Sequence, residues 1–175
     1  MRESLDRQAI ERIVRAIGDR LEGDWLLIGG ALVSLWLDSR RMTEDLDVIG
    51  MSGTLQERFA LMQVASDLGL PIEAVNSAAD FFVQRIPGWR QEVEPLLRGA
   101  RGTVFRPTPT LFLMLKASRL SAQDLADCEA MVEKARSEEL ALDGARVRQW
   151  VEALPAASDQ ALTERRLRLT SLLDR

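Results

Sequence analysis

The sequence predicts an α+β protein, in which an α/β region with a small mixed sheet flanked by helices precedes a helical bundle. Two patterns in the first half lead to this prediction: apolar residues at helical spacing, and short apolar runs bounded by glycine that are typical of buried strands. The third observation is that helical spacing continues almost without interruption from residue 109 onward. We therefore expect an α/β core over residues 1–107 and a helical region packed on it over residues 108–175.

The first four expected elements follow directly from spacing. A helix over residues 4–22 places its isoleucines on one face. The apolar run that follows ends at Gly29 and Gly30, which predicts a buried strand and then a short helix starting at the glycines. The sequence Asp-Leu-Asp-Val-Ile-Gly, residues 45–50, predicts a second strand.

A third helix is expected over residues 54–68, and its apolar face should be wide. Two neighbouring rows of apolar residues predict this width. One row consists of Leu55, Phe59, Met62 and Ala65, and the other consists of Leu61, Val64 and Leu68. After Pro71 we expect a further helix. Two short strands should then flank the glycine turn at residues 99–102.

The second half is expected to be helical throughout. The predicted helices span residues 109–119, 122–136, 143–154 and 158–173. Ser121, Asp143 and Ser158 stand at the breaks between them and have the side chains that N-cap positions favour.

Composition narrows the chemistry that this chain can perform. The formal net charge of −4 does not indicate nucleic-acid binding by the whole molecule. The sequence contains no histidine, which excludes histidine-dependent catalytic triads and His-ligated zinc sites. The single cysteine, Cys128, excludes an internal disulfide and fits a reducing compartment. Any catalysis must therefore use carboxylates, lysine, arginine, hydroxyls or a metal bound by oxygen.

Targeting and membrane signals are not expected. The first residues are charged and helical in pattern, without the apolar centre of a signal peptide. The longest uncharged run, Trp25–Leu37, has 13 residues, whereas a membrane-spanning helix needs about 20. The sequence thus predicts a cytoplasmic protein that has no membrane segment.

Two aspartates, Asp45 and Asp47, stand on either side of one leucine in the second expected strand. Because side chains alternate along a strand, both carboxylates would project from the same face. Two such charges repel each other, and a shared divalent cation relieves that repulsion. Mg²⁺ favours one or two carboxylates together with phosphate oxygens and water. The pair therefore predicts a Mg²⁺ site, the alternative being a surface strand with a polar face.

Gly29 and Gly30 end the preceding strand and open a helix. Backbone N–H groups at a helix N-terminus bind phosphate, and glycine lets a ligand approach the backbone closely. Tight packing of the strand against the helix is the alternative reason for glycine here. Because only a short helix and a loop separate these glycines from the aspartates, we expect a phosphate-binding turn beside a metal-binding pair.

The stretch from Ile28 to Gly50 resembles the signature of the polymerase-beta-type nucleotidyltransferase superfamily: Gly-Gly or Gly-Ser, a short helix, then Asp-x-Asp on the next strand. Its Arg-x-Thr-x-Asp-x-Asp form, residues 41–47, is more similar to the bacterial AbiEii-like nucleotidyltransferases, a branch that includes toxins of toxin–antitoxin systems. Members also tend to carry a Leu-x-x-Lys-x-x-Ala-x-Arg-like helix followed by spaced aspartates. The stretch "LFLMLKASRLSAQDLADCEAM" looks like that helix, although Ala117 precedes the arginine by two. The matching segments cover residues 24–50 and 108–131.

This resemblance implies a Mg²⁺-dependent, or Mn²⁺-dependent, nucleotidyltransferase that moves a nucleoside monophosphate from an NTP to a hydroxyl acceptor. A tRNA end, a protein side chain and a small molecule are the acceptor classes, and an antitoxin is an implied partner. The implied catalytic residues are Asp45 and Asp47, which also hold the metal, with Lys116 and Asp124. The implied nucleotide-binding residues are Gly29, Gly30, Ser34, Arg41, Thr43, Lys116 and Asp127.

The chain departs from the family pattern in two places. Gly30 and Ala31 stand where the superfamily often has a serine that contacts phosphate, and Ser34 lies about one helical turn further on. Active members also usually supply a third carboxylate from a later strand, and the clearest later strand here, residues 102–107, carries no acid. The candidates for this third group are Glu73, Glu92 and Glu94. A chain without it would bind nucleotide yet transfer poorly, so a degenerate nucleotide-binding or protein-interaction module is the alternative function.

Other conspicuous residues have plainer explanations. Lys116 would reach the surface from an apolar helix face, and Asp124 would act as an acid in the first turn of a helix. The basic residues from Arg165 to Arg168 are typical of a solvated helix face rather than an RNA-binding patch. The four tryptophans are expected in the core.

Overall fold

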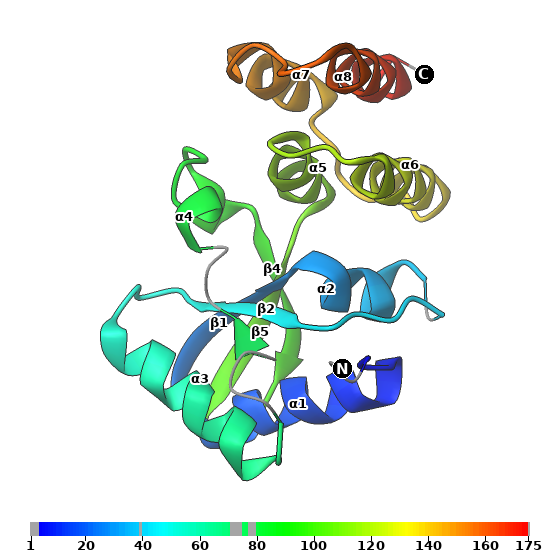
Figure 1. Cartoon of the computed structure of the whole chain (residues 1–175). Helices are drawn as coiled ribbons and strands as arrows, with labels where there is room; N and C mark the ends of the chain where they lie inside the picture. Colours follow the sequence, from blue (N-terminus) through cyan, green and yellow to red (C-terminus); the bar gives the residue numbers. More distant parts are fainter. Residues whose placement is uncertain (1–3, 39, 71–74, 77–79, 175) are drawn as a thin grey trace. The chain divides into compact units, whose positions relative to one another are not determined.

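The computed structural model describes residues 4–38, 40–70, 75–76 and 80–174 (Figure 1). It consists of helices and one small mixed sheet, which confirms the α+β fold class. The chain forms two compact units, each described by itself below. The α/β unit comprises Met1–Arg85 and Val93–Pro107, and the helical unit comprises Ile86–Glu92 and Thr108–Arg175. The expected boundary after residue 107 coincides with a boundary between the units, and residues 86–92 also belong to the helical unit.

The α/β unit is built from alternating helices and strands, as the first half of the sequence predicts (Figure 1). In chain order its elements are α1 (Arg7–Arg20), β1 (Gly23–Ile28), α2 (Gly29–Trp36), β2 (Leu46–Gly50), α3 (Leu55–Asp67), β3 (Val75–Asn76), α4 (Asp80–Val83), β4 (Val93–Arg98) and β5 (Gly102–Pro107). The strand order in the sheet is β3-β2-β1-β5-β4. Strand β1 runs antiparallel to β2 and parallel to β5, so the sheet is mixed.

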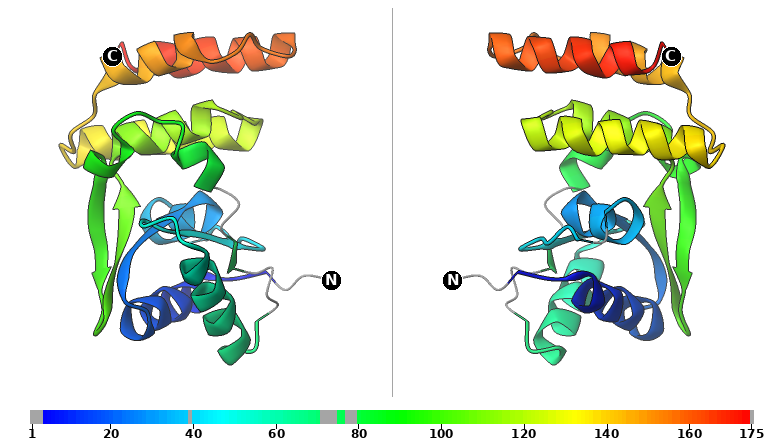
Figure 2. Two further views of the ribbon diagram at one scale, coloured as in Figure 1. Left: turned by 90° about the vertical axis from the view of Figure 1, so that its left-hand side faces the viewer. Right: turned by 90° about the vertical axis from the view of Figure 1, so that its right-hand side faces the viewer.

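The core of this unit lies between the central strands and the helices. The last four residues of β1, Trp25 to Ile28, are buried, and so are the isoleucines of α1. Helix α1 contacts both α2 and α3, and all three can be followed in Figure 2. The alternation of apolar runs and helical spacing in the sequence therefore places a continuous apolar core beneath β1 and β2.

The prediction of a helix starting after Pro71 is wrong for Val75 and Asn76. Val75 and Asn76 form β3, which pairs in parallel with Leu46 and Asp47 of β2. Val75 is buried, and pairing with the outer edge of β2 satisfies backbone groups that a lone edge would leave open. Tertiary pairing thus overrides the local helical pattern. Helix α4 then covers residues 80–83 only, and the remainder of the predicted segment lies outside the described residues.

Helix α3 buries only part of its wide apolar face. Leu61, Val64 and Ala65 are buried, whereas Leu55 and Phe59 are each 69% exposed. A helix on a sheet turns one stripe toward the core, and the rest of its surface stays outside. The wide apolar face that the spacing predicts is present, but Leu55, Phe59 and Met62 lie at its exposed part rather than in the core.

In the part of the chain that the structure describes, the helical unit contains four α-helices and a short 3₁₀ helix. They are η2 (Trp89–Gln91), α5 (Pro109–Ala117), α6 (Ala122–Ser137), α7 (Gly144–Ala153) and α8 (Gln160–Leu172). Helix α5 packs on α6 and α7, and α8 packs on the same two helices, so the unit has two layers of two helices (Figure 2). None of the helices in the described residues has the length and apolar character that crossing a membrane requires.

The caps of these helices agree with the sequence at two of three predicted positions. The side chains of Ser121 and Asp143 accept the N–H groups of Asp124 and Arg146, as N-caps do. The third prediction is wrong by one residue. Asp159 caps α8 by accepting the Leu162 N–H at 2.8 Å, because a carboxylate there accepts the orphan N–H more strongly than a serine hydroxyl.

The basic residues of α8 contact the rest of the helical unit. Arg165 donates to the carbonyl of Leu120 at 2.6 Å, and Arg166 donates to the carbonyl of Pro155 at 2.7 Å. Arg168 pairs with Glu129 at 3.0 Å. These arginines therefore connect α8 to neighbouring segments of its own unit.

Candidate functional site

The two glycines and the second aspartate of the motif meet at the junction of β1 and α2. Strand β1 ends at Ile28, which pairs with Asp47 of β2, and α2 begins at the next residue. Gly29 has a φ of 72°, in the left-handed region that favours glycine. A Cβ on Gly29 would overlap Oδ2 of Asp47 and lie 3.1 Å from its Cγ. The Asp47 carboxylate therefore lies directly against the first residue of α2.

The second glycine is needed for a similar close approach. A Cβ on Gly30 would lie 2.8 Å from Oγ1 of Thr43, which is closer than such atoms pack. The Thr43 hydroxyl donates to the carbonyl oxygen of Asp45 at 3.0 Å, and the Thr43 backbone pairs with Leu5. Gly30 thus makes room for Thr43, and Thr43 in turn positions Asp45.

The two aspartates lie on either side of a buried leucine. Leu46 is fully buried, whereas Asp45 and Asp47 are both half-buried. This is the pattern that strand alternation predicts for two side chains on one face. Asp45 immediately precedes β2 rather than lying within it. The close packing expected as an alternative role for the glycines is present, and it places the aspartates beside the N-terminus of α2.

The Asp47 carboxylate at the start of α2 favours binding of an anion together with a cation over binding of an anion alone. The N-terminal N–H groups of a helix favour negative charge. Here Asp47 already brings a carboxylate to that end of α2, and a phosphate beside it would be repelled unless a cation lay between them. Mg²⁺ takes carboxylate, phosphate and water oxygens in such a position. The residues present therefore fit a magnesium ion held by Asp45 and Asp47.

A third carboxylate from β5 is not available. Leu26 of β1 pairs with Phe105 of β5, and continuing this parallel register by two residues sets Pro107 level with Ile28 and Asp47. The proline side chain has no group that could bind a metal or activate a hydroxyl. Among the described residues there is also no cluster of three or more His, Cys, Asp or Glu side chains suited to a metal ion.

The other acids proposed for this role have different positions. Glu94 lies on β4 and pairs with Arg106 at 2.7 Å. Three strand spacings separate β4 from β2, about 14 Å at the usual spacing, so Glu94 cannot share a metal with Asp47. Glu92 belongs to the helical unit, where it accepts from Thr108 at 2.6 Å and pairs with Arg146. Glu73 lies outside the described residues.

Ser34 does not have the position that its predicted phosphate contact needs. Its side chain is fully buried in α2, and its hydroxyl has no hydrogen-bond partner among the described residues. One helical turn beyond the glycines, the helix has already rotated this position toward the core. The nucleotide-binding role predicted for Ser34 is therefore wrong in this conformation. Arg41 follows α2 and is half-buried. Its backbone N–H donates to the backbone carbonyl of Asp38 at 3.0 Å.

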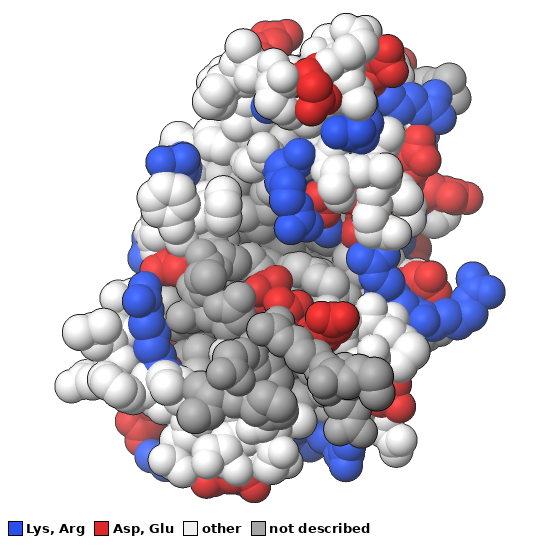
Figure 3. Space-filling model, viewed as in Figure 1, with Lys and Arg blue, Asp and Glu red and all other residues white. Residues whose placement is uncertain are grey.

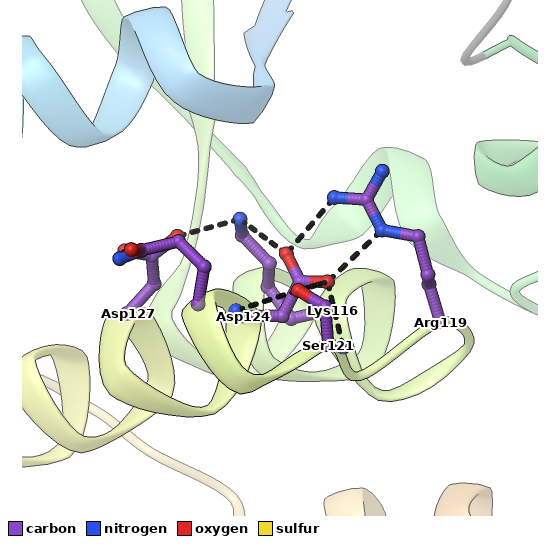
Figure 4. Close-up of polar contacts among 6 residues, drawn as sticks. Lys116, Arg119, Ser121, Asp124 and Asp127 are labelled. Carbon is purple, nitrogen blue, oxygen red and sulfur yellow. Dashed lines mark hydrogen bonds and ion pairs between the residues drawn. The ribbon is translucent and has the colours of Figure 1, made fainter. Parts of the chain in front are cut away.

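The second set of predicted residues forms a buried ionic cluster within the helical unit (Figure 4). Lys116, near the end of α5, donates to Oδ1 of Asp124 at 2.9 Å and to Oδ2 of Asp127 at 2.8 Å. The two carboxylates are only 2% and 4% exposed, and the Lys116 side chain is 12% exposed. Lys116 therefore points into the cluster rather than reaching the surface.

Asp124 accepts hydrogen bonds from three residues of the cluster, Lys116, Arg119 and Ser121. It stands at the third position of α6 in a capping box with Ser121, whose N–H and hydroxyl donate to Oδ2 at 3.0 and 2.8 Å. Arg119 adds a two-pronged contact at 3.0 and 3.1 Å (Figure 4). Burial raises the pKa of Asp124, but the hydrogen bonds from Arg119 and Lys116 outweigh burial and hold this pKa well below the usual aspartate range.

The cluster compensates its own charge. Asp127 also accepts from Gln123 at 3.2 Å, and the two cations Lys116 and Arg119 match the two aspartates. The sequence indicated Ser121 as a helix cap without linking it to Asp124. The spacing Ser-x-x-Asp, which is that of a capping box, is the signal that could have made this link.

The structure thus places the predicted residues in two groups, one in each unit. Asp45, Asp47, Gly29, Gly30 and Thr43 meet in the α/β unit, and the lysine with its aspartates meets in the helical unit. On the face shown in Figure 3, acidic and basic side chains are interspersed. The chain matches no protein-family model, no curated protein and no solved structure.

Proposed function

We propose that this chain binds Mg²⁺ and the triphosphate of an NTP at the α2 N-terminus, and that it transfers the nucleoside monophosphate to a hydroxyl acceptor. The observation that carries the proposal is the Asp47 carboxylate held against Gly29 at the start of a helix. Two half-buried carboxylates beside helix N–H groups supply the mixed charge that a metal–triphosphate needs.

Each residue of this site has a defined task in the proposal. Asp45 and Asp47 hold the metal, and the start of α2 offers N–H groups to phosphate oxygens. Thr43 positions Asp45 through its hydrogen bond to the Asp45 carbonyl. A bound Mg²⁺ would supply charge stabilisation for in-line attack on the α-phosphorus and departure of pyrophosphate.

We assign a structural role to Lys116, Asp124 and Asp127. A lysine between two buried carboxylates has its charge compensated within the protein, so little of it remains to attract phosphate. These residues instead hold α5 against α6. The catalytic and nucleotide-binding roles that the family resemblance implies for them are not part of this proposal.

A transfer assay with labelled NTPs tests the activity. All four NTPs would be supplied with Mg²⁺ or Mn²⁺, and with tRNA or protein as the acceptor. Asp45→Asn and Asp47→Asn keep the size of each side chain and remove its charge, so each should lower transfer at least 100-fold, as loss of a metal ligand does. Glu44→Gln is the matched control, because Glu44 is exposed between Thr43 and Asp45. Full activity in both Asn variants would refute the assignment.

A second candidate function is nucleotide binding without turnover. The observation that favours it is Pro107 at the level of Asp47, where a third carboxylate from β5 would stand. Calorimetry with each NTP and Mg²⁺, combined with an assay for pyrophosphate release, separates the two functions. Binding that Asp47→Asn abolishes, without pyrophosphate release from any NTP, would support the binding module and exclude the transferase.

A toxin role within a toxin–antitoxin pair is a further consequence of the transferase proposal. Growth arrest on expression in bacteria, relieved by Asp47→Asn but not by Glu44→Gln, would support it. Normal growth of cells that accumulate the folded wild-type chain would count against it.

A further inference from the structure

A groove of about 440 Å³ lies between α1, the last turn of α2 and strand β4. All three elements belong to the α/β unit, and Figure 2 shows α1 beside the β4–β5 hairpin. A volume of this size is within the usual range of protein binding sites. None of the residues assigned to the proposed nucleotide site lines this groove, which we call the α1–β4 groove.

The floor of the α1–β4 groove is apolar. Leu96 and Leu97 of β4, Leu35 of α2 and Val14 of α1 contribute to it. A bulge in β4 makes Leu96 an extra residue between the paired positions Pro95 and Leu97. Consecutive residues of a regular strand point to opposite faces, whereas here both leucines line the groove. Both are half-buried at the edge of the sheet, so the helices leave this part of β4 partly uncovered.

The α1 side of the groove is basic. Arg12 and Arg15 are exposed, and neither has a hydrogen bond or an ion pair with any residue that the structure describes. A third arginine, Arg7, pairs with Glu11 at 2.8 Å, so its charge is compensated. Two uncompensated positive charges therefore border an apolar floor, on a chain whose formal net charge is −4. This local reversal of charge favours an anionic ligand.

A partner that has both apolar and acidic side chains complements this groove. Its apolar side chains would contact the leucines, and its carboxylates would meet the arginines. Nucleic acid is a poorer match, because none of the described residues that line the groove is aromatic and a base would have no ring on which to stack. An isolated phosphate or carboxylate would leave the apolar floor unused.

The length of the groove matches about two turns of a helix. The stretch of α1 that lines it runs from Arg7 to Arg15, which is about 12 Å at the rise of an α-helix. Apolar anchors at i, i+3, i+4 and i+7 of a partner helix span about 10 Å. We propose that the α1–β4 groove binds an acidic amphipathic helix of a partner protein, with apolar anchors on Leu96 and Leu97 and carboxylates on Arg12 and Arg15.

Selection from a displayed library of random peptides, with the full chain as the target, tests the proposal. Peptides of about 16 residues are long enough for four helical turns. Peptides that also bind Arg12→Glu/Arg15→Glu are removed, and this step by itself favours acidic sequences. The decisive property is therefore the apolar pattern: the enriched peptides should have apolar residues at i, i+3, i+4 and i+7. Leu96→Gln should weaken their binding about 10-fold in fluorescence anisotropy.

Single substitutions then measure the contribution of each arginine. Arg12→Glu and Arg15→Glu should each weaken binding of an enriched peptide about 10-fold, and the loss should diminish at high salt. Arg85→Glu is the matched control, because Arg85 is an exposed arginine of the same unit outside the groove, and it should leave the dissociation constant unchanged. Circular dichroism would establish that each variant is folded.

Three outcomes would overturn the proposal. The first is that no peptide is enriched, and the second is that the enriched peptides lack helical spacing. The third is that Leu96→Gln leaves their binding unchanged, which would show that the arginines bind an anion without the apolar floor. A single-stranded RNA that displaces the peptides, and that binds Arg12→Glu/Arg15→Glu more weakly, would assign the groove to nucleic acid instead.

Discussion

The two units of this protein each contain a pair of aspartates on one side of an element, and the two pairs differ in what surrounds them. Asp124 and Asp127, three residues apart on α6, are almost completely buried and contact Lys116. Asp45 and Asp47, two residues apart at β2, are half-buried beside the N-terminus of α2. Helical spacing and strand spacing produce the same juxtaposition of like charges.

The difference shows that burial decides what a carboxylate pair can do. A fully buried pair is stable only when the protein supplies cations and hydrogen bonds to it, as the helical unit does. A half-buried pair remains hydrated and can exchange water for a metal ion and phosphate oxygens. The spacing of the aspartates is thus similar in both places, and only the half-buried pair is suited to bind a ligand. Four substitutions test this contrast.

Lys116→Met should have the largest effect. It leaves Asp124 and Asp127 buried without the cation between them, which should lower the free energy of unfolding by about 3–5 kcal/mol. Urea denaturation followed by circular dichroism would measure the loss. Lys134→Met is the control, because Lys134 pairs with Glu138 in an exposed (i, i+4) arrangement and should cost about 0.5 kcal/mol or less. Equal losses would show that burial does not set the value of these pairs.

Gly29→Ala should be the next most damaging change. The alanine would have an unfavourable positive φ, and its Cβ would overlap the Asp47 carboxylate. We therefore expect the free energy of unfolding to fall by about 3 kcal/mol. Gly53→Ala separates the two terms, since Gly53 has the same φ of 72° and nothing within 4 Å of an added Cβ. It should cost about 1 kcal/mol. In an Asp47→Ala background the penalty of Gly29→Ala should approach that of Gly53→Ala.

Asp124→Asn should lower the free energy of unfolding by about 2 kcal/mol at neutral pH, because it weakens charge-assisted hydrogen bonds from Lys116 and Arg119. The pKa of Asp124 is lower in the folded chain than in the unfolded chain. The carboxylate therefore stabilises the fold fully above the unfolded pKa of about 4, and this contribution is lost as the pH falls from there through the folded pKa.

Unfolding measured from neutral pH to about pH 2 should consequently show a shallower loss of stability in Asp124→Asn than in wild type. Asp38→Asn is a suitable control. The backbone N–H of Arg40 is the main cause of the lowered Asp38 pKa, but Asp38 is exposed and its contribution is open to solvent screening. Parallel acid profiles for wild type and Asp124→Asn would contradict the role assigned to the buried carboxylate.

Gly30→Ala should have the smallest effect and lower the free energy of unfolding by about 1 kcal/mol. Gly30 does not have a positive φ, so the cost comes only from displacing Thr43. Removing the Thr43 hydroxyl and methyl in Thr43→Ala should reduce that cost, and a double-mutant cycle would measure a coupling of about 0.5–1 kcal/mol. Additive effects would show that Gly30 and Thr43 do not interact.

Much of the fold could be predicted from local patterns. The hairpin of β4 and β5 at the glycine turn, the helix start at Gly29 and the cap at Ser121 all depend on residues close together in the sequence. The strand Val75–Asn76 could not be predicted in this way, because it exists through pairing with β2. The exposure of Leu55, Phe59 and Met62 on α3 could not be predicted either, because spacing shows how wide the apolar face of a helix is and not how much of it meets the core.

For the site, the amino-acid sequence establishes which chemical groups are present and that the two glycines precede an Asp-x-Asp pair. Tertiary structure alone decided how they meet: Asp47 against Gly29, Thr43 against Gly30, and Ser34 inside the core. It also decided that Pro107 stands level with Asp47 while Glu94 lies three strands away. The physical reason is that spacing along the chain sets the face of an element, whereas strand order and register set which faces become neighbours.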